Sequence, residues 1–503
     1  MPDVTVAIIG TGFGGIGMAV WLQRAGITDV VLLERAAGLG GTWRDNSYPG
    51  AACDVPSHLY SFSFAPNPSW SRSFSPQPEI LDYLRGVAAA EGVTGKVRFG
   101  EEVTSARWEP AGRQWRVSTT RGTLTARFLV CAGGPLSDPM VPDIPGLDTF
   151  AGAVFHSATW DHDHDLTGRN VAVVGTGASA IQFVPQIAPL VGRLTVFQRT
   201  PPWIMPRRDR RISRPERWLF RHVPVTQRIA RAGIYCGREA YALGFVKEPA
   251  ILHAAEAVAL RHMHRQVADP DLRARLTPSY RMGCKRILLS NDYYPAIARP
   301  NVSLVTEGIK EVSEAAVVTG DGREHPADTL IFGTGFHVTD FPLAQRIFGP
   351  DGISLAGRWS AGPAQTAFRG TTTAGFPNLF VLTGPNTGLG HSSQVFMIEA
   401  QIGYVLGALL HAGRRGVDRI EVRPEVQAAY ERMVRRKMRT TVWATGGCKS
   451  WYLDAEGRNV TLWPGFTWTY ARQTRRFEPS DYDLAMSVTC GTGAASPATS
   501  PGR

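Results

Sequence analysis

Short apolar runs separated by helix-period segments occur in two sets along this chain. The first set begins with VTVAIIG (4–10), continues through the helix-like GIGMAVWLQRAG (15–26) and ends in DVVLLE (29–34). The second set begins with RNVAVVG (169–175) and closes on RLTVFQRT (193–200). Apolar runs of this length, bounded by glycine and alternating with helical segments, are typical of buried parallel strands in βαβ units. The pattern therefore predicts an α/β protein with two Rossmann-like dinucleotide-binding domains.

The first apolar run leads directly into a GxGxxG loop. Its glycines are Gly10, Gly12 and Gly15. The first permits a tight turn, the second lets the backbone approach a pyrophosphate, and the third allows close helix packing, while the helix N-terminus offers N–H groups to the phosphates. Glu34 ends the second run, where a carboxylate would accept hydrogen bonds from an adenosine ribose. Strand, loop, helix and acid in this order predict a dinucleotide site.

The second loop differs from the first in the residues after its second strand. The loop has the form GxGxxA, with Gly175, Gly177 and Ala180. Where the first unit carries Glu34, this unit carries Gln198, Arg199 and Thr200. A carboxylate would repel a ribose 2′-phosphate, whereas a guanidinium can pair with it; the alternative is a solvated charge at a strand end. We therefore expect FAD at the first site and NADPH at the second, with hydride passing between them.

The order of these patterns predicts a discontinuous first domain. RFLVCAGGP (127–135) and DTLIFGTGF (328–336) are interpreted as the two crossings between the domains, and LTGPNTGLGHSS (382–393) as a return loop leading into a helix. The expected division is an FAD-binding domain of 1–136 and 335–486, an NADP-binding domain of 137–334 with a helical insertion at about 207–278, and a disordered tail of 487–503.

Two further motifs carry a family resemblance. FAGAVFHSATWD (150–161), which has the pattern of neither a strand nor a regular amphipathic helix, fits FxGxxxHxxxW(P/D) through Phe150, Gly152, His156, Trp160 and Asp161. GxWxxxxYPGxxxD is met by Gly41, Trp43, Tyr48, Pro49, Gly50 and Asp54. With both dinucleotide loops and SWYLDAEGRNVTLWPGFTW (450–468), the chain resembles type I Baeyer-Villiger monooxygenases from about residue 3 to 483. The crossing FGTGF and the dipeptide WD are mild departures from the family pattern.

The resemblance implies that FAD, NADPH and dioxygen convert a ketone to an ester or lactone through a flavin C4a-peroxide. It places the catalytic arginine on Arg286, in GCKR, with Asp54 holding it, because a fixed guanidinium can stabilise negative charge on oxygen. Lys285 would help Arg199 bind the 2′-phosphate. The implied FAD contacts include Gly41, Thr42 and Trp43.

The resemblance also implies two mobile parts. Trp451 would contact the nicotinamide side of NADP from a mobile loop of about 440–456; the alternative is a packed aromatic turn. The motif of 150–161 would bend reproducibly while the NADP domain changes position, with His156 as a hinge anchor and not an acid or base. The alternative for His156 is a packing histidine without a mechanistic role.

Composition and charge limit the classes of partner that the protein is expected to bind. The net charge is +11 and the pI about 9.6, yet no nucleic-acid-binding module is evident. Basic and aromatic residues mix in the insertion and permit a weak peripheral membrane contact, or simply a cover for the substrate side. Six cysteines without a CxxC are interpreted as isolated thiols of a reducing, cytoplasmic protein. We see no signal peptide or membrane span, and we expect a monomer or weak homodimer.

Other functions remain open at this point. A related flavin monooxygenase could oxygenate sulfur or nitrogen, or act as an uncoupled NADPH oxidase. A flavin-binding redox sensor would keep the nucleotide loops without needing both Arg286 and Asp54. A disulfide reductase is disfavoured by the missing CxxC. DHDHD (161–165) could suggest a metal, but nothing distant completes a ligand set, so we expect a polar loop and no metal.

Overall fold

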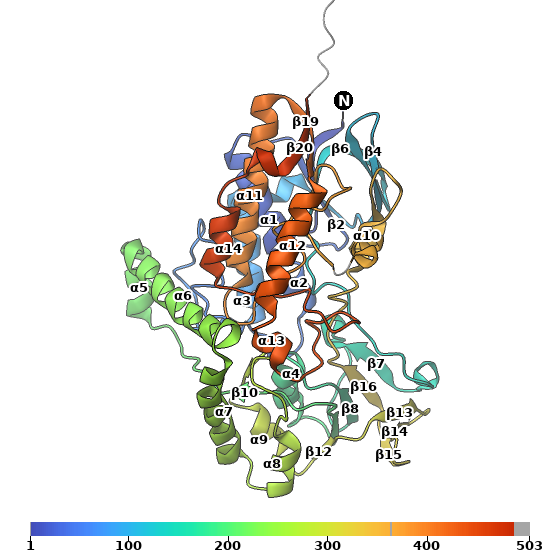
Figure 1. Cartoon of the computed structure of the whole chain (residues 1–503). Helices are drawn as coiled ribbons and strands as arrows, with labels where there is room; N and C mark the ends of the chain where they lie inside the picture. The colour runs from blue at the N-terminus through green and yellow to red at the C-terminus, as the bar shows by residue number, and fades with distance from the viewer. Residues whose placement is uncertain (1, 363–364, 487–503) are drawn as a thin grey trace, which may run out of the picture.

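The computed structural model describes residues 2–362 and 365–486. The predicted disordered tail lies outside the described residues. Figure 1 shows two bodies: the N-terminal and C-terminal segments, blue and orange-red, form one, and the green to yellow middle of the chain forms the other. The first body is therefore discontinuous in sequence. It is built on a mixed sheet, in which the strands of residues 103–131 pair antiparallel, and the second body on a parallel sheet.

The first sheet has the strand order β17, β4, β5, β6, β1, β2, β3, with β18 also paired to β6. Their bounds are β1 Val4–Ile9, β2 Val30–Glu34, β3 Val97–Phe99, β4 Val103–Glu109, β5 Gln114–Thr119, β6 Gly122–Cys131, β17 Ile347–Phe348 and β18 Leu379–Val381. β1 pairs in parallel with β2 and β6, and Val381 of β18 lies opposite Cys131 of β6. Both parts of the chain thus complete the same sheet.

Helices of the first body pack around this sheet (Figure 1). The helices are α1 (Phe13–Arg24), α3 (Gln77–Ala90), α11 (Gln394–Arg415), α12 (Pro424–Met438) and α14 (Thr467–Thr474). α11 is long and apolar enough to cross a membrane by composition, but 56% of its most apolar window is buried inside the protein. It packs against α1 and α14 (Figure 1) and shares one core with α1, in which Ile16 and Ile402 are fully buried. α11 is thus the core helix of the first body.

The second sheet is parallel throughout and has the order β12, β9, β8, β16, β7. Its strands are β7 Ala153–His156, β8 Asn170–Val174, β9 Arg193–Phe197, β12 Val302–Val305 and β16 Thr329–Phe332. The expectation that 150–161 contains no strand was wrong, because β7 pairs with β16 at the sheet edge, with Phe155 opposite Ile331. The partner strand is far away in sequence, so four residues of local pattern could not reveal the pairing.

Smaller elements complete the second body. α4 (Ala180–Ile187) and α9 (Tyr293–Ile297) pack on the sheet and on each other. A three-stranded antiparallel sheet consists of β13 Ile309–Val312, β14 Ala316–Thr319 and β15 Glu324–Pro326. Near the C-terminus of the described chain, β19 (Val417–Val422) pairs antiparallel with β20 (Tyr482–Met486) on the first body.

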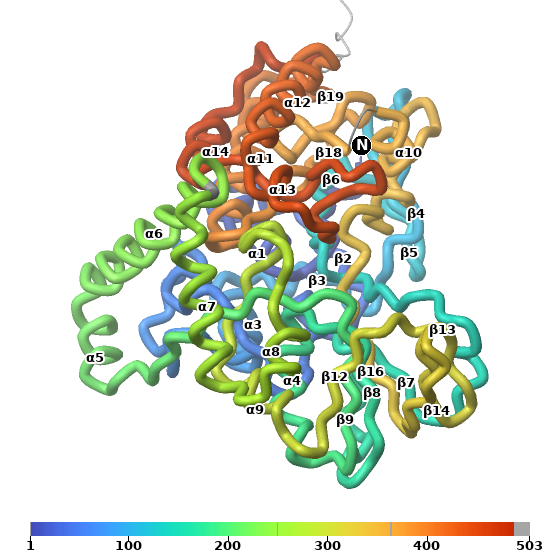
Figure 2. The backbone as a smooth tube through the Cα atoms, turned by 60° about the horizontal axis from the view of Figure 1, so that its bottom comes forward, coloured from blue at the N-terminus to red at the C-terminus, as the bar shows by residue number. Residues whose placement is uncertain are grey.

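Four α-helices follow β9 before α9 leads the chain back to the second sheet. They are α5 Arg214–His222, α6 Pro224–Val246, α7 Leu252–Gln266 and α8 Pro270–Leu276. α5 begins with Ser213, whose side chain accepts from the Glu216 N–H, and has proline in its first turn. Two short parallel strands, β10 (Ile204–Met205) and β11 (Leu288–Leu289), join the base of this segment. α5 and the start of α6 project from the body in both views (Figure 2).

Candidate active site

The first glycine loop has the shape that a dinucleotide phosphate needs. Gly10 has a φ of +98°, and a Cβ there would lie 2.7 Å from the Ala132 carbonyl oxygen. A Cβ on Gly15 would lie 1.9 Å from the Gly10 oxygen, so both positions require glycine. Beside Gly12, by contrast, a Cβ would meet only the Gly41 Cα at 4.0 Å. This open cradle at the start of α1 fits the pyrophosphate of FAD.

Glu34 organises the loop as well as ending β2. One carboxylate oxygen accepts from the Thr11 N–H at 3.2 Å and the Thr11 hydroxyl at 2.6 Å. The other accepts from the Ala36 N–H at 2.9 Å and pairs with Arg44 at 2.8 Å. The carboxylate is thereby fixed at the edge of the site. The sequence motif predicts a ribose contact for Glu34 but gives no sign of Thr11 and Arg44 as its partners.

Gly41, Thr42 and Trp43 border the same loop. Gly41 has a φ of +51°, and a Cβ there would lie 3.2 Å from the Gly12 Cα, so the two glycines approach closely. The next residues begin the short helix α2 (Thr42–Asp45). The Trp43 indole N–H donates to the Tyr60 hydroxyl at 3.0 Å, which fixes the indole beside the loop. All three predicted FAD contacts thus lie together.

The second loop repeats this design. Gly175 has a φ of +109°, and a Cβ would lie 2.6 Å from the Gly333 oxygen, whereas a Cβ on Gly177 would meet that oxygen only at 3.7 Å. Ala180 is buried at the first residue of α4. The open side of Gly177 fits a second dinucleotide phosphate.

The residues after β9 give this second site its charge. Arg199 is exposed and Thr200 half-buried. Partial burial and the nearby charge of Arg199 lower the pKa of Lys285. Two cations held near each other, with Lys285 also 5.2 Å from the Tyr280 ring centroid, suit a doubly charged phosphate. Gln198 instead is buried and donates to the Arg275 carbonyl at 2.8 Å.

Asp54 and Arg286 form a bidentate ion pair. The Arg286 Nε lies 2.8 Å and its Nη2 2.7 Å from the two Asp54 carboxylate oxygens. The side chains of Arg286 and Asp54 remain 33% and 25% exposed, so the pair faces an accessible space. Burial alone would raise the pKa of Asp54, but the Arg286 charge and hydrogen bonds hold it below its usual value. The Asp54 charge in turn raises the pKa of Arg286. Both groups are therefore ionised at neutral pH.

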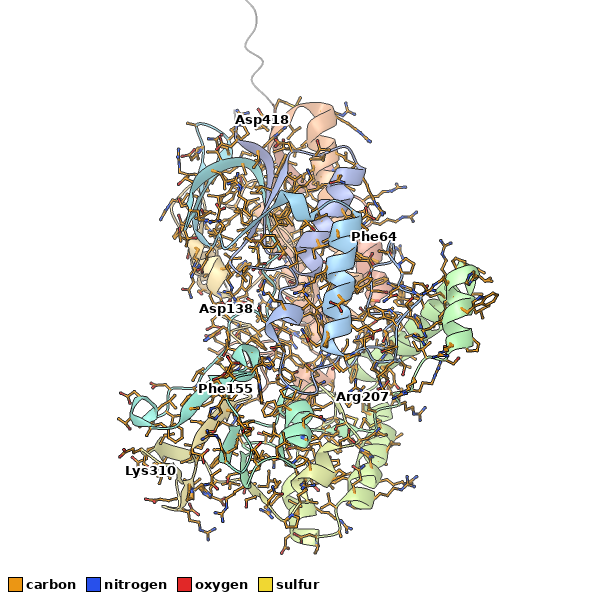
Figure 3. All side chains as sticks on the ribbon, turned by 180° about the vertical axis from the view of Figure 1, so that it is seen from behind. Phe64, Asp138, Phe155, Arg207, Lys310 and Asp418 are labelled. Atoms are coloured by element: carbon orange, nitrogen blue, oxygen red, sulfur yellow. A yellow bond between two sulfur atoms is a disulfide. The ribbon has the colours of Figure 1, made fainter. Side chains whose placement is uncertain are left out.

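The motif that carries Asp54 also joins the two bodies. Gln182 of α4 accepts from the Tyr48 hydroxyl at 2.9 Å and from the Ala52 N–H at 3.3 Å. Gly50 lies so close that a Cβ would be 2.7 Å from the Gln182 carbonyl oxygen. Arg207 donates to the carbonyl just before Asp54, that of Cys53, at 3.3 Å, and Figure 3 shows Arg207 at the level where the bodies meet. Sequence reasoning did not identify Gln182 or Arg207.

The connector of 150–161 is anchored along its length. Phe150 is buried, and a Cβ on Gly152 would lie 2.3 Å from the Asp328 oxygen, so only glycine fits. Trp160 packs on Phe183 of α4 with ring centroids 5.3 Å apart, and Asp161 accepts from the Asp163 N–H. His156 is buried and its Nδ1 accepts from the Ala158 N–H at 3.0 Å. Burial lowers the pKa of His156 to about 4, so its imidazole is neutral.

The interpretation of all cysteines as isolated thiols was wrong. Cys284 and Cys448 form a disulfide across 164 residues, with Cα atoms 6.2 Å apart. Folding brings the GCKR segment against the loop that carries Trp451, and spacing in the sequence could not reveal this. Cys53, Cys131 and Cys236 are free, and Cys490 lies outside the described residues. Trp451 is 44% exposed and packs on Tyr452.

The two histidines of DHDHD have separate protein partners. His162 hydrogen-bonds the Ser47 hydroxyl at 2.8 Å, and His164 the Thr329 hydroxyl at 2.9 Å. Within residues 2–362 and 365–486, no three His, Cys, Asp or Glu side chains gather as a metal site. The segment is a polar loop whose histidines bind the segment of Ser47 and the strand β16.

Comparisons with known proteins agree with this arrangement. Residues 7–219 match the family described as pyridine nucleotide-disulphide oxidoreductase. A Baeyer-Villiger monooxygenase of Streptomyces coelicolor is 54% identical over 98% of this chain and 94% of its own length. The chain belongs to the Baeyer-Villiger monooxygenases.

Solved structures extend the likeness to the whole fold. A steroid monooxygenase bound to NADP superposes with a TM-score of 0.85 at 30% identity, covering 96% of this chain and 100% of its own. OTEMO in complex with FAD and NADP gives a TM-score of 0.86 at 27% identity, with the same coverage. As a member of this family, the protein is an FAD- and NADPH-dependent monooxygenase, with one Rossmann-like domain for each cofactor.

Proposed function

We propose that the protein converts ketones to esters or lactones at the Asp54–Arg286 pair. The single observation that carries this proposal is the bidentate geometry of that pair, at 2.7 and 2.8 Å, on the segment that joins the two bodies. A ketone oxygenation needs a fixed positive charge beside the reacting oxygen atoms. Neither a disulfide reductase nor a nucleotide-binding sensor needs such a charge.

When bound, FAD reduced by NADPH supplies the activation of dioxygen. The residues for holding FAD are Gly10, Gly12, Gly15, Glu34, Gly41, Thr42, Trp43 and Asp54. The open side of Gly12 supports this assignment, since the loop leaves room for phosphate there and nowhere beside Gly10 or Gly15.

Arg286 stabilises negative charge that develops on oxygen. Asp54 accepts from two of its N–H groups, which fixes the guanidinium plane and leaves other N–H groups free to donate toward substrate. The pair remains ionised because its two charges support each other. Asp54 is thus a positioning group, and Arg286 the group that touches the reacting atoms.

Arg199, Lys285 and Thr200 bind the 2′-phosphate of NADPH, with Gly175, Gly177 and Ala180 at the pyrophosphate. The mutual proximity of Arg199 and Lys285 supports this role. Trp451 covers the nicotinamide side from the loop of 440–456. The connector through Phe150, Gly152, His156, Trp160 and Asp161 lets the NADP domain move about a fixed hinge, which the tight packing of Gly152 supports.

The function is tested with NADPH, labelled dioxygen and a panel of linear, cyclic, aryl and steroid ketones, with a sulfide as comparison. Mass spectrometry should find esters or lactones carrying one labelled oxygen atom. Sulfoxide as the sole product, or peroxide without any oxygenated product, would contradict the proposed ketone chemistry.

Three further assignments concern the compartment, the oligomeric state and membrane contact. We propose a cytoplasmic monomer or weak homodimer, in line with the NADPH requirement. The α5–α6 segment makes weak contact with anionic membranes, because exposed Trp218 and Ile229 lie among exposed arginines such as Arg221 and Arg228. Co-sedimentation with anionic but not zwitterionic vesicles, lost in Ile229→Glu, tests the contact, and light scattering tests the oligomeric state.

A further inference from the structure

Helix α6 turns charged side chains toward the protein. Arg238, in the second half of the helix, is half-buried, and its neighbour Glu239 is buried. Val225 and Ile229 on the same helix are more than half exposed. A charged residue is rarely buried unless a specific partner holds it. Each of the two has such partners: Arg238 on the segment that carries Asp54, and Glu239 on the loop before α11 and at the start of α14.

Arg238 reaches the segment that carries Asp54. Its Nη2 donates to the Asp54 backbone carbonyl at 3.0 Å. Burial lowers the pKa of Arg238, and the charge of Asp54 acts in the opposite direction, so the guanidinium lies close to the ion pair. By holding this carbonyl, Arg238 fixes the backbone from which the Asp54 side chain extends to Arg286.

Glu239 reaches the loop that precedes α11. Its carboxylate accepts from the Thr467 N–H and hydroxyl, both at 2.8 Å, and contacts His391 Nε2 at 3.2 Å. Burial would raise the pKa of Glu239, but His391 and Thr467 hold it below its usual value, so the carboxylate is ionised. An ionised carboxylate can only accept, so His391 Nε2 carries the hydrogen. In the neutral imidazole this leaves Nδ1 as an acceptor.

The His391 Nδ1 atom is buried without a hydrogen-bond partner among the described residues, and so are the hydroxyls of Ser392 and Ser393. The three residues are consecutive and lead directly into α11. Buried polar groups almost always have a partner. Three orphaned groups in a row therefore mark where a bound molecule completes the site, and both donors and acceptors are offered to it.

We propose that Arg238 and Glu239 are positioning residues that hold the two sides of the active site in register from α6. Arg238 sets the Asp54–Arg286 pair. Glu239 sets the tautomer and orientation of His391, so that Nδ1 accepts a hydrogen bond from bound cofactor. The role of Arg238 rests on the proposed function, because that function makes the Asp54–Arg286 pair catalytic. The role of Glu239 rests only on its contact with His391.

The test uses the FAD-loaded enzyme and the variants Arg238→Met and Glu239→Gln. Arg238→Lys keeps a charge, Glu239→Asp keeps a shorter carboxylate, and Arg228→Met is a control on the exposed side of the same helix. FAD content, melting temperature, the visible flavin spectrum, the rate of anaerobic reduction by NADPH, and ester and hydrogen peroxide formed per NADPH are measured.

In Arg238→Met we expect reduction within about threefold of wild type, but ester per NADPH lower by at least about tenfold, with peroxide making up the difference. Arg238→Lys should recover part of this loss. In both Glu239 variants the flavin spectrum should shift, and Arg228→Met should leave every quantity unchanged.

Two results would overturn the inference. One is an unchanged spectrum and unchanged coupling in folded Arg238→Met and Glu239→Gln. The other is a loss of coupling only in proportion to lost FAD and lowered melting temperature, which a purely structural role would give. A wild-type enzyme that forms no ester would refute the proposed function instead, and the spectrum and reduction rate would still decide the role of Glu239.

Discussion

The two glycine loops share one backbone design and differ in the residues at the end of the second strand. Gly10 and Gly175 both adopt positive φ, +98° and +109°, and a Cβ at these positions would lie only 2.7 and 2.6 Å from a carbonyl oxygen. At the first site the strand ends in Glu34, which is buried and bound by Thr11 and Arg44. At the second, Arg199 is exposed beside Lys285. We therefore propose that the strand end, more than the loop, selects a ribose hydroxyl at one site and a phosphate at the other.

Glu34→Gln should have the largest effect on the first site. The change removes the charge of Glu34, the buried partner of Arg44, so that Arg44 keeps only its ion pair with the partly exposed Asp45. It also replaces one of the two carboxylate oxygens that accept from backbone N–H groups beside Glu34. Removing one partner of a buried pair costs roughly 3–5 kcal/mol. We expect near-complete loss of FAD and a clearly lower melting temperature. Glu102→Gln, at the surface pair with Arg346, should change neither, and normal FAD content in Glu34→Gln would refute the role of Glu34.

The connector between the two sites should respond to pH. A histidine in the unfolded chain binds a proton near pH 6.5, whereas His156 in the folded protein does so only near pH 4. The contribution of neutral His156 to the free energy of unfolding is therefore fully present above pH 6.5. It is lost as the pH falls toward 4, which lowers the free energy of unfolding by up to about 3 kcal/mol. His156→Asn, whose amide oxygen can replace Nδ1 as acceptor for the Ala158 N–H, should remove this dependence in urea unfolding at pH 7 and 5. Exposed His253→Asn should preserve it.

Arg199→Ala tests whether the second site selects NADPH over NADH. A charged hydrogen-bonded pair contributes about 2 kcal/mol, or roughly thirtyfold in affinity. The KM for NADPH should rise by that factor while the KM for NADH changes little and FAD content stays normal. Arg193→Ala, exposed at the start of the same strand, is the matched control. Equal effects on NADPH and NADH would remove the 2′-phosphate assignment.

The smallest expected effect concerns the disulfide, whose Cys284 directly precedes Lys285 of the second site. Cys448→Ser frees the loop of Trp451 from Cys284, the neighbour of Lys285. Ordering that loop on binding would then cost about 0.5 kcal/mol, or roughly a twofold rise in the KM for NADPH. FAD content should not change. In the control Cys236→Ser, which alters an exposed free thiol, both the KM for NADPH and the FAD content should stay at their wild-type values. A loss of FAD in Cys448→Ser would contradict this prediction, because it would show that the disulfide affects the first dinucleotide site.

Local pattern was enough to predict the nucleotide loops. Gly10, Gly15 and Gly175 are glycines because a carbonyl oxygen occupies the place of a side chain, and such steric needs recur at fixed spacing. The pairing of Asp54 with Arg286, 232 residues apart, came from the family resemblance and not from spacing, and the structure brings the two side chains together.

Contacts made only by folding escaped prediction. The strand β7 depends on β16, and the Cys284–Cys448 bond depends on two loops meeting. Gln182, Arg238 and Glu239 lie on helices whose sequence gives no sign of what they contact. Their importance comes from burial and partners, which a single sequence does not encode at any fixed spacing.

The most direct test of the account is Arg286→Ala in a single turnover with labelled dioxygen and a ketone that the wild-type enzyme accepts, with Arg286→Lys beside it. Because the role proposed for Arg286 is to stabilise charge on oxygen and not to bind NADPH, we expect anaerobic reduction by NADPH within about threefold of wild type and labelled ester lower by at least about a hundredfold, with peroxide in its place. Labelled ester formed by Arg286→Ala at the wild-type rate would contradict the account.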